Sequence, residues 1–215
     1  MRERILRRAV ELFNERGVEY LGIRELAKDL GIKGGNINYY FPTKDDLVVA
    51  VARLLQERND ATLRIPEAPS LSAYMEMLAA AFRNQYAFRG LFLSMPNLML
   101  RNRKLAASYI GSVEKQRRRV LRDFLLALQE AGYLRADVEG EVLERTVSFI
   151  GLVTRGWIGD ASMSFRDRTP EWCMEHYLAI TSDHLAGLAT EKGLADLERP
   201  EASTVRGKGR AAVPS

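Results

Sequence analysis

Cysteine and histidine are scarce in this sequence. Cys173 is the only cysteine, so no internal disulfide can form, and a reducing, cytoplasmic setting is expected. His176 and His184 stand eight residues apart, and no carboxylate–histidine cluster accompanies them, so no bound metal is expected. Serine–histidine–aspartate sets, nucleophile elbows and phosphate-binding loops are missing as well. We therefore expect no catalytic residue, no cofactor and no enzyme.

Long hydrophobic runs are also missing. The longest, Leu47 to Leu55, is interrupted by Arg53, whereas a membrane span needs roughly 18 apolar residues. The basic start MRERILRRAV has no apolar core behind it, so it is not a secretory signal. Hydrophobic residues make up 47% and charged residues 28%, as in soluble globular proteins. The sequence predicts a cytoplasmic protein with no membrane partner.

A strong excess of one charge sign is absent too. The formal net charge is +4, and residues 1–52 contain nine lysines and arginines against eight acidic residues. Such a balance permits nucleic-acid binding without indicating it. A case for DNA binding must therefore rest on geometry and local placement.

Helical periodicity dominates the chain, and no convincing strand alternation occurs, which predicts an all-α fold. A first helix ends at Gly17, and Thr43 opens a fourth one with Asp46 in a capping-box position. The shorter helices between them are predicted at 23–30 and 34–40. Longer helices are predicted at roughly 70–88, 102–131, 138–159 and 170–190, with a break at Met95–Pro96–Asn97.

The stretch from residue 23 to 42 places two short helices around a tight corner. Gly31 falls at that corner, where the chain needs a left-handed conformation, and Ala27 is small where the second helix passes close. The apolar residues expected in the angle are Leu26, Leu30, Ile32, Ile37 and Tyr40. This pattern predicts a helix-turn-helix, whose second helix enters the DNA major groove. An ordinary helical hairpin is the alternative.

The other side of the second helix carries groups suited to DNA. Gly34 and Gly35 begin this helix, where free backbone N–H groups can meet phosphates, and asparagine can pair with adenine through two hydrogen bonds. The predicted DNA-contacting residues are Lys33, Gly34, Gly35, Asn36, Asn38, Tyr39, Tyr40, Thr43 and Lys44. For Lys44, a solvated surface lysine is an equal alternative.

Residues 5–52 resemble the DNA-binding domain of the TetR family of bacterial transcriptional regulators. The matching blocks are ILRRAVELFNERG, IRELAKDLGI and GNINYYFPTKDDL. In the last block, the positions that match the family pattern are Gly35, Asn36, Ile37, Tyr40, Phe41, Lys44 and Leu47. The departures are Leu21–Gly22 in place of a Thr or Ser cap, Gly34 in place of Lys or Pro, and Asn38 in place of Tyr. The resemblance implies an all-helical second domain that dimerises and binds a small molecule.

Three segments are therefore predicted. Residues 1–52 form a three-helix helix-turn-helix domain with the start of a linking helix. Residues 53–195 form a larger helical domain for ligand binding and dimerisation. Residues 196–215 are rich in Ala, Ser, Gly, Pro and basic residues, so a disordered tail is expected there.

Two late apolar stripes are predicted to form a dimer surface as a four-helix bundle. The first consists of Val138, Val142, Thr146, Phe149, Ile150, Val153 and Trp157, and the second of Trp172, Tyr177, Ile180, Leu185 and Leu188. Gly151 and Gly187 would allow close approach. The alternative is that both stripes belong to internal core helices.

A ligand pocket is predicted from aromatic and methionine residues at helical spacing, for which core packing is the alternative. They are Phe82, Tyr86, Phe88, Phe92, Met95, Met99, Tyr109, Phe149 and Trp157. Arg155 lies in an apolar run and is either an anchor for an anionic ligand or a surface residue. The basic run KQRRRVLRDFL is interpreted as a solvated helix face, with an ion pair between Glu114 and Arg118.

The predicted function is that of a ligand-released repressor. Its partners would be a palindromic operator in double-stranded DNA, a second copy of the chain and an unidentified small-molecule effector. The alternatives are a ligand-independent or activating regulator, and a helical small-molecule binder or enzyme that carries a helix-turn-helix module.

Overall fold

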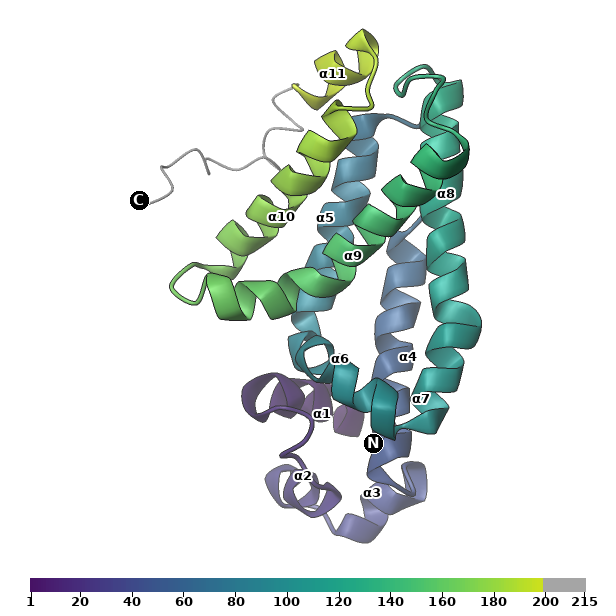
Figure 1. Ribbon diagram of the computed structural model, residues 1–215. Helices are drawn as coiled ribbons and strands as arrows, with labels where there is room; N and C mark the ends of the chain where they lie inside the picture. Colours follow the sequence, from purple (N-terminus) through teal and green to yellow (C-terminus); the bar gives the residue numbers. More distant parts are fainter. Residues whose placement is uncertain (199–215) are drawn as a thin grey trace. The chain divides into compact units, whose positions relative to one another are not determined.

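The computed structural model describes residues 1–198, which form helices joined by turns (Figure 1). An isolated bridge between Leu134 and Ala189 is the extent of β-pairing in this range. The prediction of an all-α fold is confirmed. Among the same residues, no helix is both long and apolar enough to cross a bilayer.

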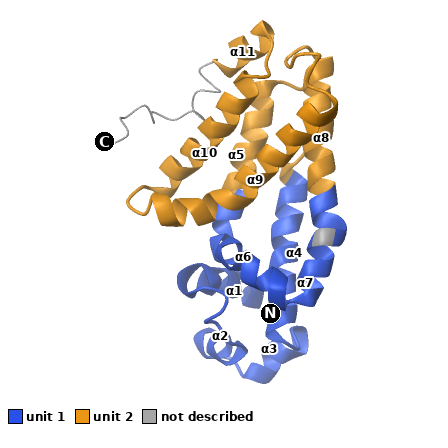
Figure 2. Cartoon of the chain, viewed as in Figure 1, with its two compact units in different colours: residues 1–61, 84–115 blue, residues 62–83, 116–215 orange. Residues whose placement is uncertain are grey.

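The chain divides into two compact units (Figure 2). Unit 1 consists of Met1–Ala61 and Asn84–Lys115, and unit 2 of Thr62–Arg83 and the chain from Gln116 onward. These units do not follow the predicted linear division after residue 52, because a later segment packs with the N-terminal helices. Of the predicted tail, Asp196 and Leu197 are buried in a helix, and residues 199–215 lie outside the described residues.

Unit 1 contains the predicted N-terminal helices. They are α1 (Arg2–Arg16), α2 (Ile23–Leu30), α3 (Gly34–Tyr40) and α4 (Lys44–Thr62), followed after the excursion into unit 2 by α6 (Arg89–Arg101), α7 (Arg103–Ser108) and a π-helical turn (Tyr109–Val113). Gly17 ends α1 with φ 86°, as expected for a glycine stop. Residues from all four N-terminal helices, such as Ile5, Leu26, Ile37 and Leu47, are almost fully buried in one core.

Helix α6 occupies the stretch where a break was predicted. Pro96 lies inside this helix, although proline lacks the N–H that the helical ladder needs. Gly90, Leu91 and Ser94 are buried on α6, which packs against α1. Burial of this face offsets the cost of the proline, so the prediction of a break at 95–97 is wrong.

Helix α6 also approaches α1 very closely at its first turn. A Cβ at Gly90 would lie 2.1 Å from the Phe13 carbonyl oxygen and 2.8 Å from the Asn14 nitrogen. The Asn14 side chain spans the junction: its Nδ2 donates to the Ala87 carbonyl at 2.8 Å, and its Oδ1 accepts from the Gly90 N–H at 2.8 Å. These contacts fasten the later segment of unit 1 to its first helix.

Within the described residues, unit 2 is built from five helical segments. They are α5 (Leu71–Ala87, of which residues 71–83 belong here), α8 (Glu114–Glu130, from Gln116), α9 (Gly140–Ser164), α10 (Pro170–Ala186) and α11 (Glu191–Leu197). Two helix predictions need correction. The helix expected at 102–131 is interrupted by the π-helical turn, and the one expected at 170–190 stops at residue 186, before α11.

Helix α11 caps the start of α5. Asp196 is 2% exposed, and its carboxylate accepts hydrogen bonds from the Ser72 N–H at 2.9 Å and the Ser72 hydroxyl at 3.3 Å. An acceptor at this position satisfies one of the N–H groups that the first helical turn leaves unpaired.

Replacing Asp196 with alanine should therefore lower the free energy of unfolding by about 0.5–2 kcal/mol, the usual effect of losing a helix cap. Urea denaturation followed by circular dichroism measures the change. Asp137→Ala is a suitable control, because Asp137 is exposed. Equal stability of the two variants would show that the Asp196–Ser72 contact contributes nothing.

Candidate nucleic-acid interface

The corner between α2 and α3 has the predicted geometry. Gly31 is left-handed at φ 66° and ψ 31°, and its N–H donates to the Lys28 carbonyl at 3.2 Å. The next residue, Ile32, donates to the Ala27 carbonyl at 3.0 Å. These hydrogen bonds close α2 and redirect the chain into α3, so the helix-turn-helix prediction is confirmed.

Helix α3 buries one narrow face. Ile37 is fully buried, whereas Tyr39 is 82% and Tyr40 38% exposed. The prediction that Tyr40 points into the angle between the helices is wrong. Phe41 takes that place at 2% exposure, because the chain leaves the helix at this residue with φ −137° and ψ 89° and so turns the Phe41 ring inward.

The remaining predicted DNA-contacting residues of this segment lie away from the buried face. Lys33, Gly35, Asn36 and Asn38 are exposed, and Gly34 is half-buried. Gly34 and Gly35 have no positive φ, and among the described residues a Cβ at either would meet no atom within 4 Å outside its chain neighbours and its own helix backbone. Neither glycine is therefore required by backbone conformation or by packing within the described chain.

Helix α4 begins with a reciprocal cap. The Asp46 N–H donates to Thr43 Oγ1 at 3.1 Å, and the Thr43 N–H donates to Asp46 Oδ2 at 3.2 Å, which confirms the predicted capping box. Lys104 of α7 pairs with Asp46 at 2.6 Å. Hydrogen bonds from Lys104 and Thr43 hold the pKa of the Asp46 carboxyl below its usual value.

The Lys44 side chain is hydrogen-bonded to the turn after α1. Its Nζ donates to the Glu19 carbonyl at 2.9 Å, and burial lowers the pKa of the ammonium group. Ser94 of α6 donates to the Glu19 carboxylate at 2.7 Å. Burial alone would raise the pKa of Glu19, but hydrogen bonds from Ser94, the Glu19 backbone and Asn97 outweigh it, so the pKa is lowered. The Lys44 ammonium is thus positioned at the start of α4.

The predicted ligand residues are divided between the units. In unit 2, Phe82 and Trp157 are buried and stack with ring centroids 5.0 Å apart. Phe149 is half-buried and stacks on His184, with centroids 4.2 Å apart. Phe82 and Trp157 are therefore brought together, while Phe149 contributes to the packing of α9 on α10.

The others belong to unit 1. Phe88 is buried, and Phe92, Met95 and Met99 pack at the edge of the unit 1 core. Tyr86 lies under the Arg89 guanidinium, 4.9 Å from ring centroid to Cζ, and the Tyr109 hydroxyl donates to Glu114 at 3.4 Å. A pocket lined by all of these residues stays a prediction.

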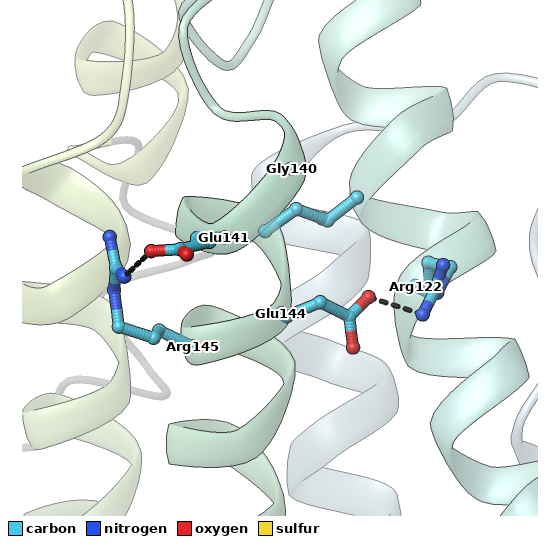
Figure 3. Close-up of a pocket in the computed structure, with 6 residues that line it drawn as sticks. Arg122, Gly140, Glu141, Glu144 and Arg145 are labelled. Atoms are coloured by element: carbon cyan, nitrogen blue, oxygen red, sulfur yellow. Dashed lines mark hydrogen bonds and ion pairs between the residues drawn. The ribbon is translucent and has the colours of Figure 1, made fainter.

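Two surface hollows are lined mainly by residues outside the predicted ligand set. One, of about 600 Å³, is lined by Arg122, Gly140, Glu141, Leu143, Glu144 and Arg145. Figure 3 shows Glu144 paired with Arg122, and Glu141 paired with Arg145. Arg118 also pairs with Glu144, at 3.1 Å, and the expected pair with Glu114 stays a prediction. The other hollow, of about 360 Å³, lies between α1 and α4 and includes Leu6, Leu54 and Phe88.

The two late stripes divide between interior and surface. Thr146, Ile150, Trp157, Tyr177 and Leu185 are buried within unit 2, as the core alternative required. The exposed apolar residues on the same two helices are Leu152 (64%), Met163 (70%) and Ile180 (36%). Sequence reasoning missed Leu152 and Met163, because they follow polar or small neighbours and lie outside the buried stripe.

Two arginines differ in where their side chains lie. Arg155, the predicted anion anchor, is exposed, whereas Arg117 of the basic run reaches α9 and donates to Thr154 Oγ1 at 3.2 Å. Sequence reasoning missed Arg117, because nothing in the run distinguishes it from its neighbours. Within the described residues, no three His, Cys, Asp or Glu side chains are placed to hold a metal ion.

Solved structures share this fold at low sequence identity. A TetR-family transcriptional regulator from Marinobacter aquaeolei VT8 is 19% identical with a TM-score of 0.80, covering 91% of this chain and 96% of that one. The ketosteroid transcriptional regulator KstR2 of Mycobacterium tuberculosis is 23% identical with a TM-score of 0.63, covering 88% and 95%. CprB from S. coelicolor A3(2) is 16% identical with a TM-score of 0.68, covering 96% and 98%. At these identities the likeness concerns the fold alone.

Family profiles cover almost all of the described chain. No curated protein sequence is significantly similar to it. However, the profile of "Bacterial regulatory proteins, tetR family" matches residues 5–51, and a profile described as "Bacterial transcriptional repressor" matches residues 51–196. Together with the helix-turn-helix geometry, these matches show that the chain belongs to the TetR family of bacterial transcriptional regulators.

Proposed function

We propose that the protein is a dimeric repressor that binds a palindromic operator through α3 and is released by a small-molecule effector. The observation that carries the DNA-binding part is the surface of α3. Lys33, Asn36, Asn38 and Tyr39 are exposed along a helix whose opposite face holds Ile37 in the core. Asparagine and lysine on such a surface suit base edges and phosphates.

The two glycines of α3 support the same proposal. Glycine loses more conformational freedom on folding than any other residue, which is a cost to stability. Because neither Gly34 nor Gly35 is needed for conformation or internal packing, that cost is unexplained by the chain itself. Close approach of the α3 backbone to DNA accounts for it.

Gly35→Ala tests this interpretation. The substitution should leave the free energy of unfolding unchanged or raise it by about 0.4–1 kcal/mol. Affinity for the DNA flanking the protein's own gene, measured by fluorescence anisotropy, should fall. Unchanged affinity in the variant, or failure of the wild-type protein to bind that DNA above its non-specific affinity, would contradict the proposal.

Asn36 and Lys44 should contribute in different ways. Asn36→Ala should change the preferred operator bases, at about 1–3 kcal/mol for a lost bidentate contact. Lys44→Ala should weaken binding to all sequences and lower the slope of affinity against salt by about 1. Binding to a panel of operator variants at several salt concentrations separates the two effects. The assignment fails if Asn36→Ala weakens every sequence equally while Lys44→Ala changes base preference.

The second copy would pair through α9 and α10. Leu152 and Met163 of α9 and Ile180 of α10 are exposed apolar residues, and Gly156 is exposed on the same helix as Leu152. Two α3 helices related by a two-fold axis would read half-sites about 34–36 Å apart, or a multiple of that distance. A single short helix makes too few contacts for the roughly 10⁻⁸–10⁻¹¹ M affinity of specific regulators.

Effector release would act through α4, which starts beside the helix-turn-helix and ends at Thr62, the first residue of unit 2. A coupling of about 1–3 kcal/mol would lower operator affinity roughly 5- to 150-fold, and operator DNA would weaken effector binding by the same factor. KstR2, a similar structure, is described as a ketosteroid regulator. We infer a mostly apolar effector here as well, acting in the cytoplasm where the chromosome is accessible.

A further inference from the structure

The interior of unit 2 contains a polar group that DNA binding does not use. Tyr74 of α5 is fully buried, and its hydroxyl has no hydrogen-bond partner among the described residues. Burial raises the pKa of Tyr74, so the hydroxyl stays protonated and able to donate. A buried hydroxyl without a partner has lost its hydrogen bonds to water and gained none in return. Such a group in a folded protein calls for an acceptor, and an effector can supply it.

Arg117 lies on α8, the helix whose Phe124 ring contacts the Tyr74 ring. The positive charge of Arg117 lowers the pKa of Tyr74, against the larger effect of burial. Arg117 Nη1 donates to Thr154 Oγ1 at 3.2 Å and to the Gly151 carbonyl at 3.5 Å, both on α9. A Cβ at Gly151 would lie 3.0 Å from both Nη atoms, so a larger residue there would crowd the Arg117 guanidinium.

Aromatic rings on the same helices provide apolar surface. The Tyr74 ring meets Phe124 of α8 edge to face, with centroids 4.8 Å apart. Phe82 of α5 stacks on Trp157 of α9 with an interplanar angle of 9°. Helices α5, α8 and α9 thus each contribute an aromatic ring, and α5 and α8 also contribute a donor suited to an oxygen anion.

We propose that unit 2 binds an apolar effector bearing one carboxylate, with Arg117 pairing with the carboxylate, Tyr74 donating to it, and Phe82 and Trp157 contacting the apolar part. This inference rests on the proposed ligand-responsive function. The planar guanidinium matches a carboxylate through two parallel hydrogen bonds, which a hydroxyl or an amine of the effector cannot reproduce. Because Tyr74, Phe82 and Trp157 are at most 2% exposed, the effector enters by separating the helices that carry them.

Matched pairs of probes test the carboxylate requirement. Dodecanoate and dodecanol form one pair, and 1-naphthoate and 1-naphthol the other, each used below its micelle concentration. The chain has two tryptophans, so Trp172→Phe leaves Trp157 as the sole fluorescent reporter. At least one carboxylate should change Trp157 fluorescence saturably and bind about tenfold or more tightly than its alcohol, as expected for a charge-assisted hydrogen-bonded pair.

Variants of the two donors locate the site. Arg117→Gln should reduce the preference for the carboxylate to within about twofold. Arg117→Lys keeps the positive charge but lacks the planar pair of N–H donors, so it should retain part of the preference. Tyr74→Phe should weaken carboxylate binding severalfold and alcohol binding less, because a hydrogen bond to a charged acceptor is the stronger one. The inference is overturned if neither carboxylate binds the wild-type protein, if the alcohols bind as tightly, or if both Arg117 variants keep the full preference.

Operator binding by the same preparations separates this inference from the proposed function. A protein that binds DNA but neither carboxylate overturns the inference alone. A protein that binds a carboxylate through Arg117 but does not bind DNA overturns the repressor function alone.

Discussion

Gly90→Ala should be among the most destabilising single substitutions in unit 1. The added methyl carbon would lie 2.1 Å from the Phe13 carbonyl oxygen and 2.4 Å from the Phe13 carbonyl carbon. Both are backbone atoms, so no side-chain rotation relieves the overlap. Helix α6 must move away from α1, and the hydrogen bonds that Asn14 makes to Ala87 and Gly90 lengthen or break.

The expected loss is about 1–3 kcal/mol in the free energy of unfolding, and more if the backbone cannot relax. For a chain of this size, each kcal/mol shifts the midpoint of thermal unfolding by roughly 2–4 °C. Differential scanning calorimetry measures the shift. Weaker operator binding should accompany it at temperatures near the midpoint, because α1 packs directly against α2 of the helix-turn-helix.

Gly111→Ala is the matched control. Among the described residues, a Cβ at Gly111 would meet no atom within 4 Å outside its chain neighbours and its own helix backbone, so this variant should differ from wild type by less than about 0.5 kcal/mol. A Gly90→Ala protein as stable as the Gly111→Ala protein would mean that α6 and α1 do not approach each other as closely as the structure has them.

Leu152→Asp should separate the proposed dimer. Leu152 is 64% exposed on α9, and in the proposed dimer it would face the second copy. A carboxylate at that position would be desolvated on dimer formation without gaining an oppositely charged partner, and this cost opposes association. The variant should sediment as a monomer at micromolar concentration, whereas the wild-type protein sediments as a dimer.

Operator affinity should fall when the dimer is lost. When both α3 helices belong to one particle, the second half-site binds at a high effective concentration, an advantage of about 10²–10⁴. The Leu152→Asp protein should lose most of that factor in an anisotropy titration. Its fold should be intact, because an exposed position has little effect on the stability of the subunit.

Leu100→Asp is the control for this experiment. Leu100 is more exposed than Leu152, at 84%, but lies on α6 of unit 1, a helix outside the proposed dimer surface. This variant should remain a dimer with wild-type affinity. A dimeric Leu152→Asp protein would place the dimer surface elsewhere, and a monomeric wild-type protein with full affinity for one half-site would contradict the dimer itself.

Features that depend on neighbouring residues were predictable from the sequence. Gly31 is left-handed because a tight corner needs a residue without a Cβ, and Thr43 and Asp46 cap α4 because they stand three residues apart. The alternation of buried and exposed positions around Ile37 follows from the helical repeat. The family resemblance relied on the same short-range pattern, so the residue types and their spacing were enough to recognise it.

The features that were predicted wrongly from the sequence depend on contacts between distant parts of the chain. Pro96 is tolerated in α6 because that helix buries a face against α1, some eighty residues earlier in the sequence. Phe41 replaces Tyr40 in the core because of the direction in which the chain leaves α3. Neither outcome can be derived from local propensity, since each is set by the free energy of long-range packing.

The candidate effector site shows the same division. The sequence by itself determined an all-helical fold with a helix-turn-helix, because periodicity, glycine corners and caps act over a few residues. Its resemblance to the TetR family indicated a regulator. The sequence also placed Phe82 and Trp157 among the pocket candidates but could not pair them. Only the tertiary structure decided that Arg117, one of several arginines in a basic run, turns toward Thr154, and that the buried Tyr74 hydroxyl has no partner in the part of the chain that the structure describes. The physical reason is that burial and hydrogen bonding between helices are set by how α5, α8 and α9 pack together.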